Sequence, residues 1–223
     1  MRQIPLAIGV EAARSFDNFV PGANALAVAH LKALAPQAAP VYLWGASGSG
    51  KTHLLQAYVH RLQEQGSRAG CFGCIDPAPW LNDDAWAAVV FDDCDALDAD
   101  QQHAAFALFV EATTRGVPVV AAGRVPPVDL PLREDLRTRL GWGHVFAIEP
   151  LGEAEARATL RREADIRGIF LSDEVMSYLL TRFERDLKHL MAQLDRLDEF
   201  SLATKRQITV PLLKQMLAEE SGA

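Results

Sequence analysis

No run of apolar residues in this sequence is long enough to cross a membrane, although 49% of its 223 residues are hydrophobic. The first residues also lack the charged and then apolar pattern of a secretory signal. Only three cysteines are present, which excludes an even disulfide framework. We therefore expect a cytoplasmic protein with no membrane partner, whose hydrophobic residues fill internal cores.

A basic excess is missing as well. The formal net charge is −7, and neither the part before residue 150 nor the part after it has more basic than acidic residues. Proteins that bind duplex DNA on their own neutralise its phosphates with lysine and arginine. DNA is therefore not expected to be the main direct partner of this chain.

Cys71 and Cys74 form a C-x-x-C pair, the only one in the sequence. A structural zinc site of this type needs a second pair of ligands, which the sequence does not offer. The two cysteines lie in an apolar stretch, 69–75, so a plain β-strand is favoured over a metal or redox role.

Residues 41–53 hold the strongest motif. Four strand-like residues, 41–44, run into Gly45-Ala46-Ser47-Gly48-Ser49-Gly50-Lys51-Thr52, which fits the phosphate-binding pattern G-x-x-x-x-G-K-[ST] at every fixed position. Glycines let backbone N–H groups approach phosphate oxygens, and a helix expected over 51–65 would point its positive dipole end at them. The sequence therefore predicts a nucleotide site with these residues: Gly45, Gly48, Ser49, Gly50, Lys51, Thr52 and His53.

Two side chains of this motif have separate expected roles. Lys51 would reach the outer phosphates of a nucleotide, and the Thr52 hydroxyl would bind Mg²⁺. The alternative is a glycine-rich turn without a ligand, which the strand, loop and helix context disfavours. The expected cofactors are ADP or ATP, together with Mg²⁺.

Strands alternate with helices up to residue 150. Further strands are predicted at 69–75, 87–92, 117–122 and 144–148, and further helices at 24–34, 101–114 and 132–140. This alternation is typical of an α/β fold with a parallel, helix-covered sheet. The stretch 87–92 is continuously apolar before its final aspartate, as expected of a strand buried on both faces.

The pattern becomes helical after residue 150. Helices are predicted at 153–167, 173–182, 185–203 and 211–218, with at most a short strand at 207–208. The expected domains are a tail over 1–10, a nucleotide-binding α/β domain over 11–150 and a small helical lid domain over 151–223.

Asp92 and Asp93 stand at the end of the strand predicted over 87–92. An apolar strand that ends in Asp-Asp is the form of a Walker B element, in which Asp92 would hold the Mg²⁺ shell. Asp93 would then orient or polarise an attacking water. The aspartates that follow are expected to be solvated surface charges: Asp95, Asp98 and Asp100.

Two arginines invite a functional interpretation. An isolated arginine on a helix is usually a surface residue. Arg139, however, lies just before the last core strand, where ATPase assemblies place an arginine that completes a neighbour's site. Arg185 lies in the helical region, from which a lid arginine would contact the bound nucleotide. From the residues alone, both interpretations remain open.

The first ten residues are expected to be extended, because Pro5 and Gly9 disfavour a helix. An extended segment with one polar side chain followed by spaced apolar side chains can dock in a groove of another protein. A frayed end that folds back on its own core is the alternative, and the residues alone do not choose between them. The residues that would carry the docking are Gln3, Ile4, Pro5, Leu6 and Ile8.

Together these elements resemble the AAA+ family and, within it, the bacterial replication-initiator branch. The similar segments are 16–20, 43–54, 91–93, 139–143 and 185–187, so the resemblance covers nearly the whole chain. It implies that 16–20, with Val20, helps to wall the adenine pocket, that Arg139 is an arginine finger and that Arg185 is a sensor II residue. The short tail over 3–8 resembles a sliding-clamp-binding motif, and the sequence stops after the lid without the initiators' DNA-binding domain.

This combination implies a regulator rather than an initiator. Such a protein would hold a nucleotide, dock on the sliding clamp of DNA polymerase III (its beta subunit) on DNA and stimulate ATP hydrolysis by the initiator DnaA. Arg139 would act in trans, re-initiation would be prevented, and DNA would be met mainly through the clamp. The resemblance is also compatible with a homodimer and with a place at the nucleoid or replisome.

One departure concerns the chain's own hydrolysis. AAA+ ATPases usually place a polar sensor I residue after the fourth strand, where this sequence has Gly123 and Arg124. Glycine has no side chain to position water, and arginine has no acceptor. The chain's own ATPase activity is therefore expected to be weak at most. The alternatives are a self-sufficient ATPase, such as a helicase loader, and a module that binds DNA directly.

Overall fold

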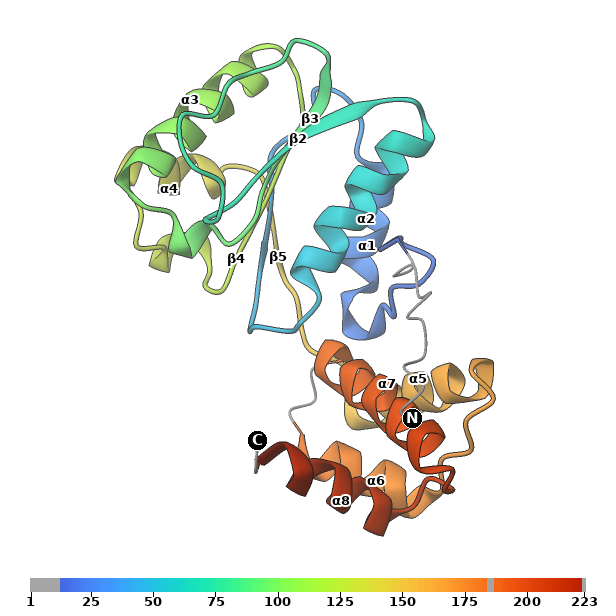
Figure 1. Ribbon diagram of the computed structural model, residues 1–223. Helices are drawn as coiled ribbons and strands as arrows, with labels where there is room; N and C mark the ends of the chain where they lie inside the picture. Colours follow the sequence, from blue (N-terminus) through green and yellow to red (C-terminus); the bar gives the residue numbers. More distant parts are fainter. Residues whose placement is uncertain (1–12, 184–186, 222–223) are drawn as a thin grey trace.

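The computed structural model describes residues 13–183 and 187–221. Its first part is built on a five-stranded sheet in the order β2-β3-β4-β1-β5, and every pair of neighbouring strands is parallel (Figure 1). This confirms the predicted parallel sheet. The strands are β1 (Val41–Trp44), β2 (Arg68–Phe72), β3 (Trp86–Phe91), β4 (Val119–Gly123) and β5 (His144–Ala147).

Helices cover both faces of the sheet (Figure 1). On one face, α1 (Ala25–Ala33) and α2 (Lys51–Glu64) form a core with alternate residues of the central strands. On the other face, α3 (Ala99–Thr114) and α4 (Glu134–Leu140) form a second core. Three single turns of 3-10 helix complete this part: η1 (Gly22–Asn24), η2 (Cys94–Ala96) and η3 (Pro127–Asp129).

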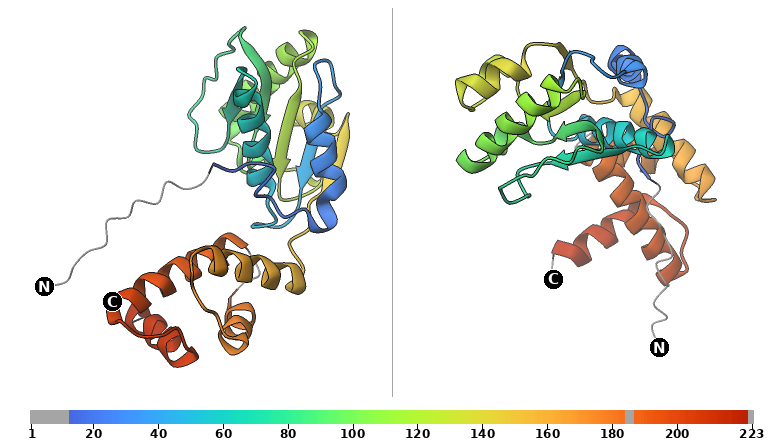
Figure 2. Two further views of the ribbon diagram at one scale, coloured as in Figure 1. Left: turned by 90° about the vertical axis from the view of Figure 1, so that its right-hand side faces the viewer. Right: turned by 90° about the horizontal axis from the view of Figure 1, so that it is seen from above.

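The second part is a bundle of helices with its own core (Figure 2). Ser172 begins the second of these helices by accepting a hydrogen bond from the Val175 N–H at 3.3 Å. No strand is described among residues 151–183 and 187–221, so the short strand suggested at 207–208 is wrong. Ile208 instead packs on the bundle core between two helices, where no neighbouring strand could pair with it. The helices are α5 (Glu153–Ile166), α6 (Asp173–Arg182), α7 (Leu187–Thr204) and α8 (Val210–Ser221).

Two element boundaries differ from the predicted ones because side chains intervene. The strand predicted over 69–75 ends at Phe72, since the Asp76 carboxylate accepts a hydrogen bond from the Gly73 N–H at 2.8 Å and closes a turn. The helix predicted from residue 101 begins at Ala99, since Asp98 and Gln101 form a reciprocal capping box.

Asn24 binds the segment that leads from β5 into the helical part. Its side-chain amide donates to the Glu149 carbonyl at 2.9 Å and accepts from the Glu149 N–H at 2.8 Å, just before the chain enters the helical part. Gly22 lies against α5, because a Cβ built on it would stand 3.0 Å from the Glu155 carboxylate. The loop between β1 and α2 therefore lies at the end of the sheet that faces the helical bundle (Figure 1).

None of the helices described over 13–183 and 187–221 combines the length and the hydropathy that a membrane span needs.

Candidate nucleotide-binding site

The loop between β1 and α2 is shaped by close backbone approaches. Gly45 donates a hydrogen bond to the Gly123 carbonyl at 3.3 Å, and a Cβ built on Gly45 would stand 2.2 Å from the Ile148 carbonyl oxygen. Gly50, at the start of α2, has a φ of 102°, a conformation that side chains disfavour. The Phe19 ring lies so close that a Cβ on Gly50 would be 2.8 Å from it. Only glycine fits at these two positions.

Lys51 has no ion-pair partner and Ser49 has no hydrogen-bond partner among the described residues, although both side chains are buried. The Lys51 ammonium is buried and donates to the carbonyls of Gly45 and Ala46, each at 2.8 Å. Burial lowers the pKa of Lys51, while the carboxylates of Asp92 and Asp93 oppose that shift. The Ser49 hydroxyl is buried and finds no hydrogen-bond partner among the described residues.

Such groups fit a phosphate. An unpaired buried hydroxyl calls for a missing acceptor, and an ammonium that holds only neutral carbonyls still carries a full charge to neutralise. Both stand at the N-terminus of α2, whose free N–H groups and dipole favour an anion. The residues predicted to bind a nucleotide in this loop are therefore brought together by the fold, and their chemistry fits its phosphates.

Asp92 lies beside the Thr52 side chain. Burial raises the pKa of the Asp92 carboxyl, and hydrogen bonds from the Thr52 side chain and the Asp93 N–H oppose that rise. A hydroxyl next to one carboxylate fits Mg²⁺, which typically takes one or two carboxylates together with substrate phosphates and water. Over the described ranges, no three His, Cys, Asp or Glu side chains are grouped to hold a metal by themselves. Asp93 is exposed, with a left-handed backbone φ of 48°.

His53 ties the opening segment to α2. Its Nε2 atom lies 3.0 Å from the Ser15 carbonyl and 2.9 Å from the Asn18 side-chain oxygen, and its ring meets the Phe19 ring edge-on at 5.2 Å. Burial lowers the pKa of His53, although the Ser15 hydrogen bond opposes it. Val20, half-buried, follows directly after Phe19. The contacts of His53 thus place the predicted adenine-pocket segment beside the phosphate loop.

Tyr42 fills the place of a sensor I side chain. It is fully buried on β1, and its hydroxyl donates to the Val125 carbonyl at 3.1 Å. A Cβ built on Gly123 would stand 2.2 Å from that hydroxyl oxygen, so no side chain fits there while Tyr42 keeps its position. The apolar pattern of the strand gives no signal for this contact.

Arg124 is held by Asp95. One carboxylate oxygen accepts from the Arg124 N–H at 2.8 Å, and the other lies 2.9 Å from its Nε. The Asp95 side chain is only 12% exposed. The prediction that Asp95 is a solvated surface charge is therefore wrong, because a partner 29 residues away in the sequence packs over it.

Arg139 lies at the opposite end of the sheet. It lies in the last turn of α4, shortly before β5, whose first residue His144 pairs with Val41 at the start of β1. The phosphate loop follows Trp44 at the other end of β1, roughly 10 Å further along the strand. Arg139 is therefore not part of the phosphate site of its own chain. Its guanidinium carbon lies 5.1 Å from the Phe106 ring centroid and 4.8 Å from the Trp142 ring centroid.

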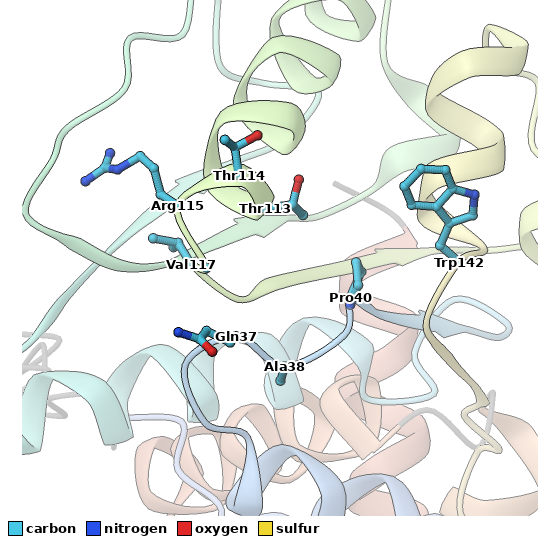
Figure 3. A pocket seen from close by; sticks show the side chains of 9 residues that line it. Gln37, Ala38, Pro40, Thr113, Thr114, Arg115, Val117 and Trp142 are labelled. Atoms are coloured by element: carbon cyan, nitrogen blue, oxygen red, sulfur yellow. The ribbon is translucent and has the colours of Figure 1, made fainter.

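The surface near Arg139 is hollowed on both sides of Trp142, whose side chain is 63% exposed. One hollow of about 440 Å³ lies between Trp142 and the segments that lead into β1 and β4, including Pro40 and Val117 (Figure 3). A second, of about 630 Å³, lies between Trp142, Arg139 and the start of α4. Both hollows lie at the amino ends of the strands, away from the phosphate loop.

Several predicted site residues lie outside the described ranges. These are the candidate lid arginine, Arg185, and the candidate clamp-binding residues of the tail: Gln3, Ile4, Pro5, Leu6 and Ile8.

Comparisons with known proteins agree on the relatives of both parts. Residues 153–217 match the family model of the Hda lid domain, and residues 10–70 match that of the bacterial DnaA ATPase domain. Domain III of DnaA from Thermotoga maritima has 21% identity and a TM-score of 0.78, over 95% of this chain and 98% of that one. AMPPCP-bound DnaA from Aquifex aeolicus has 19% identity and a TM-score of 0.69, over 84% of this chain and 65% of that one.

A more distant likeness confirms the fold. The Holliday junction branch migration motor RuvB from Thermotoga maritima has 15% identity and a TM-score of 0.61, over 81% of this chain and 61% of that one. The match to Aquifex DnaA spans about two thirds of that chain's length.

Proposed function

Because this chain is a AAA+ protein related to Hda and DnaA, we propose that it is a nucleotide-bound regulator that stimulates ATP hydrolysis by the initiator DnaA and so prevents re-initiation. The placement of Arg139 carries this proposal. It lies at the end of the sheet away from its own phosphate loop, so the ATP that it could serve is that of another subunit.

The chain's own site would hold a nucleotide rather than turn it over rapidly. Lys51, Ser49 and the backbone N–H groups of the loop would hold the phosphates of ADP or ATP, and Thr52 and Asp92 would hold Mg²⁺. The phosphates would supply the negative charge that this loop lacks. Gly123 offers no polar side chain at the sensor I position, which supports weak hydrolysis at this site.

Two further residues have proposed roles at the same site. Asp93 would orient the water for whatever slow hydrolysis takes place there. Arg185, reaching from the lid, would contact the bound nucleotide and so couple the lid to the nucleotide state. Both residues would act on the nucleotide of their own chain and not on the ATP of the partner.

In the partner's site, Arg139 would donate hydrogen bonds to the phosphate oxygens on which negative charge develops during hydrolysis. A planar guanidinium suits this task because it stays charged and presents several N–H donors in one plane. An arginine supplied by a second protein accelerates hydrolysis by about 10³- to 10⁵-fold in well-studied cases. This is the step in which the chain would act as an activator.

Recruitment would depend on the tail. Gln3 and Leu6 would dock in a groove of the DNA polymerase III sliding clamp, with Ile4, Pro5 and Ile8 as further contacts. Docking on the DNA-loaded clamp would tie the inactivation of DnaA to replication that has already started. The acidic net charge of −7 supports an indirect contact with DNA.

The main rival function is a self-sufficient ATPase such as a helicase loader. The complete phosphate loop and the contact between Asp92 and Thr52 favour it. This rival predicts appreciable ATP turnover without clamp or DnaA, and it predicts that changes to the tail are harmless.

The test is single-turnover hydrolysis of labelled ATP preloaded on DnaA, with this protein, the clamp and DNA added. Wild type should accelerate hydrolysis. Arg139→Ala and a Gln3→Ala/Leu6→Ala double variant should not, for lack of the finger and of recruitment respectively. Arg137→Ala, in the last turn of the same helix, is the matched control and should retain the acceleration.

A wild-type protein that leaves the ATP of DnaA intact but hydrolyses free ATP itself would overturn the proposal in favour of the rival. Equal losses in Arg137→Ala and Arg139→Ala would point to the basic last turn of α4 rather than to a single arginine.

A further inference from the structure

Two aromatic side chains lie against the Arg139 guanidinium. Phe106 comes from the middle of α3 and Trp142 from the turn after α4, with ring centroids 5.1 Å and 4.8 Å from the guanidinium carbon. These distances are within the range of cation–π attraction, which extends to about 6 Å. Helix α3 and the turn after α4 thus converge on one side chain.

No carboxylate among the described residues forms an ion pair with Arg139. In the hollow that Arg139 lines, Asp135 is already paired with Arg133 at 2.7 Å. Glu134 also lines this hollow but forms no ion pair with Arg139. Within residues 13–183 and 187–221, no acidic side chain lies in ion-pair distance of Arg139. The aromatic contacts are therefore what fixes this guanidinium.

A ring contact and an ion pair differ in whether the N–H donors of the arginine remain available to a ligand. An aromatic ring carries no net charge, so a cation–π contact leaves the positive charge of the guanidinium in place and puts no carboxylate oxygen on its N–H donors. A carboxylate would instead occupy those donors and neutralise the charge. Aromatic neighbours restrict the motion of Arg139 and leave its donors for a phosphate.

We propose that Phe106 and Trp142 are positioning residues for Arg139, holding its guanidinium by ring contacts in place of an ion pair, so that its charge and its N–H donors remain for a phosphate of the partner's nucleotide. The proposal rests on the proposed trans-acting function of Arg139. Part of the entropy of ordering a long side chain is then lost before the partner arrives, which lowers the barrier of the step that Arg139 assists.

Trp142 is the better of the two residues to change. It is 63% exposed, so its replacement leaves the core intact, whereas Phe106 is half-buried and packs against the core of α3 and α4. Trp142→Leu removes the ring and keeps an apolar side chain. Trp142→Phe restores a ring and serves as the rescue.

The first experiment measures single-turnover hydrolysis on DnaA against the concentration of this protein, with clamp and DNA present. Trp142→Leu should lower the maximal rate constant about 3- to 10-fold, with little change in the concentration for half-maximal effect. Trp142→Phe should recover most of the rate. In an Arg139→Ala background, Trp142→Leu should have no further effect, because the two residues act as one unit.

The second experiment needs no partner. In ¹H–¹⁵N spectra of the free protein, the Nε–H signal of Arg139, assigned by its loss in Arg139→Ala, should carry a ring-current shift. That shift should decrease in Trp142→Leu and in part return in Trp142→Phe. Phe106→Leu, if it folds with an unchanged circular dichroism spectrum, should act in the same direction.

An Arg139 signal that Trp142→Leu does not move would overturn the inference while the proposed function stands. So would an equal loss of rate from Trp142→Leu in the Arg139→Ala background, or an effect only on the half-maximal concentration, because Trp142 would then contact the partner directly. A wild-type protein without any stimulation would overturn the proposed function and, with it, the role of the rings.

Discussion

The two ends of the sheet each carry an arginine next to a strand, one after β4 and one before β5, and the two are held in different ways. Arg124, after β4, has its backbone N–H and its Nε bound by Asp95. Arg139, before β5, has two aromatic rings against its guanidinium. An ion pair neutralises the charge and occupies donors, whereas ring contacts leave both available. The same residue type is thus fitted to different tasks by its neighbours.

The largest effects should come from removing one charged group at each end. Lys51→Ala should weaken ADP binding about 10- to 100-fold, because its ammonium is a charged hydrogen-bond donor to the phosphates. Arg139→Ala should leave ADP binding unchanged and lower the stimulated hydrolysis on DnaA by on the order of 10³-fold. Calorimetry with ADP and the DnaA assay separate the two. A loss of ADP affinity in Arg139→Ala would place Arg139 at the same nucleotide site as Lys51.

The next effect concerns the lack of room for a side chain at Gly123, at the end of the sheet that carries the phosphate loop. Gly123→Ser should lower the free energy of unfolding by about 1–3 kcal/mol, since its Cβ would stand 2.2 Å from the Tyr42 hydroxyl oxygen. Urea unfolding followed by circular dichroism measures this change. Tyr42→Phe in the same chain should recover part of the loss, because it removes the atom in the way. Tyr42→Phe alone is the control, and an equally unstable double variant would contradict this account.

A smaller effect should follow from releasing Arg124. Asp95→Asn removes a negative charge near the phosphate loop and frees the Arg124 guanidinium, while the amide oxygen still accepts from its N–H. ADP binding should tighten by a few-fold at most, since partly exposed ion pairs contribute about 0–1 kcal/mol. Asp100→Asn, exposed on α3, is the matched control for calorimetry. Unchanged or weaker binding in Asp95→Asn would show that Asp95 does not restrain Arg124 in this way.

The smallest effect is on the pH dependence of the free energy of unfolding, and it involves one histidine near each end of the sheet. Burial lowers the pKa of His53, beside the phosphate loop, and of His30, whose ring lies 4.3 Å from that of His144 at the start of β5. The unfolded chain therefore takes up protons more readily as the pH falls below about 6.5, and the free energy of unfolding should fall with it. Stability from these groups is thus fully present above that pH.

Urea unfolding at pH 7.5 and at pH 5.5 measures this dependence. His53→Gln and His30→Gln should each reduce the loss of stability between the two pH values, whereas His103→Gln, on the exposed side of α3, serves as the control. A loss of stability that is the same in all three variants would assign it to other groups.

Local patterns were enough to predict much of the fold and of the candidate site. The phosphate loop was predicted because its glycines, lysine and threonine are adjacent in the sequence and depend on one strand and one helix. The apolar run before Asp92 predicted a strand buried on both faces, and β3 lies inside the sheet between β2 and β4 with Ala88 to Phe91 buried. The strand suggested at 207–208 failed because a β-strand needs a neighbour, which two residues cannot reveal.

The sequence by itself determined the elements whose causes lie within a few residues: the phosphate loop, the alternation of strands and helices, and the helical second part. Tertiary structure alone decided which distant side chains meet. It packed Tyr42 into the space beside Gly123, paired Asp95 with Arg124 and set Phe106 and Trp142 against Arg139. The physical reason is that local propensities act along the chain, whereas burial, ion pairing and ring contacts depend on distances in space that only the packed sheet fixes.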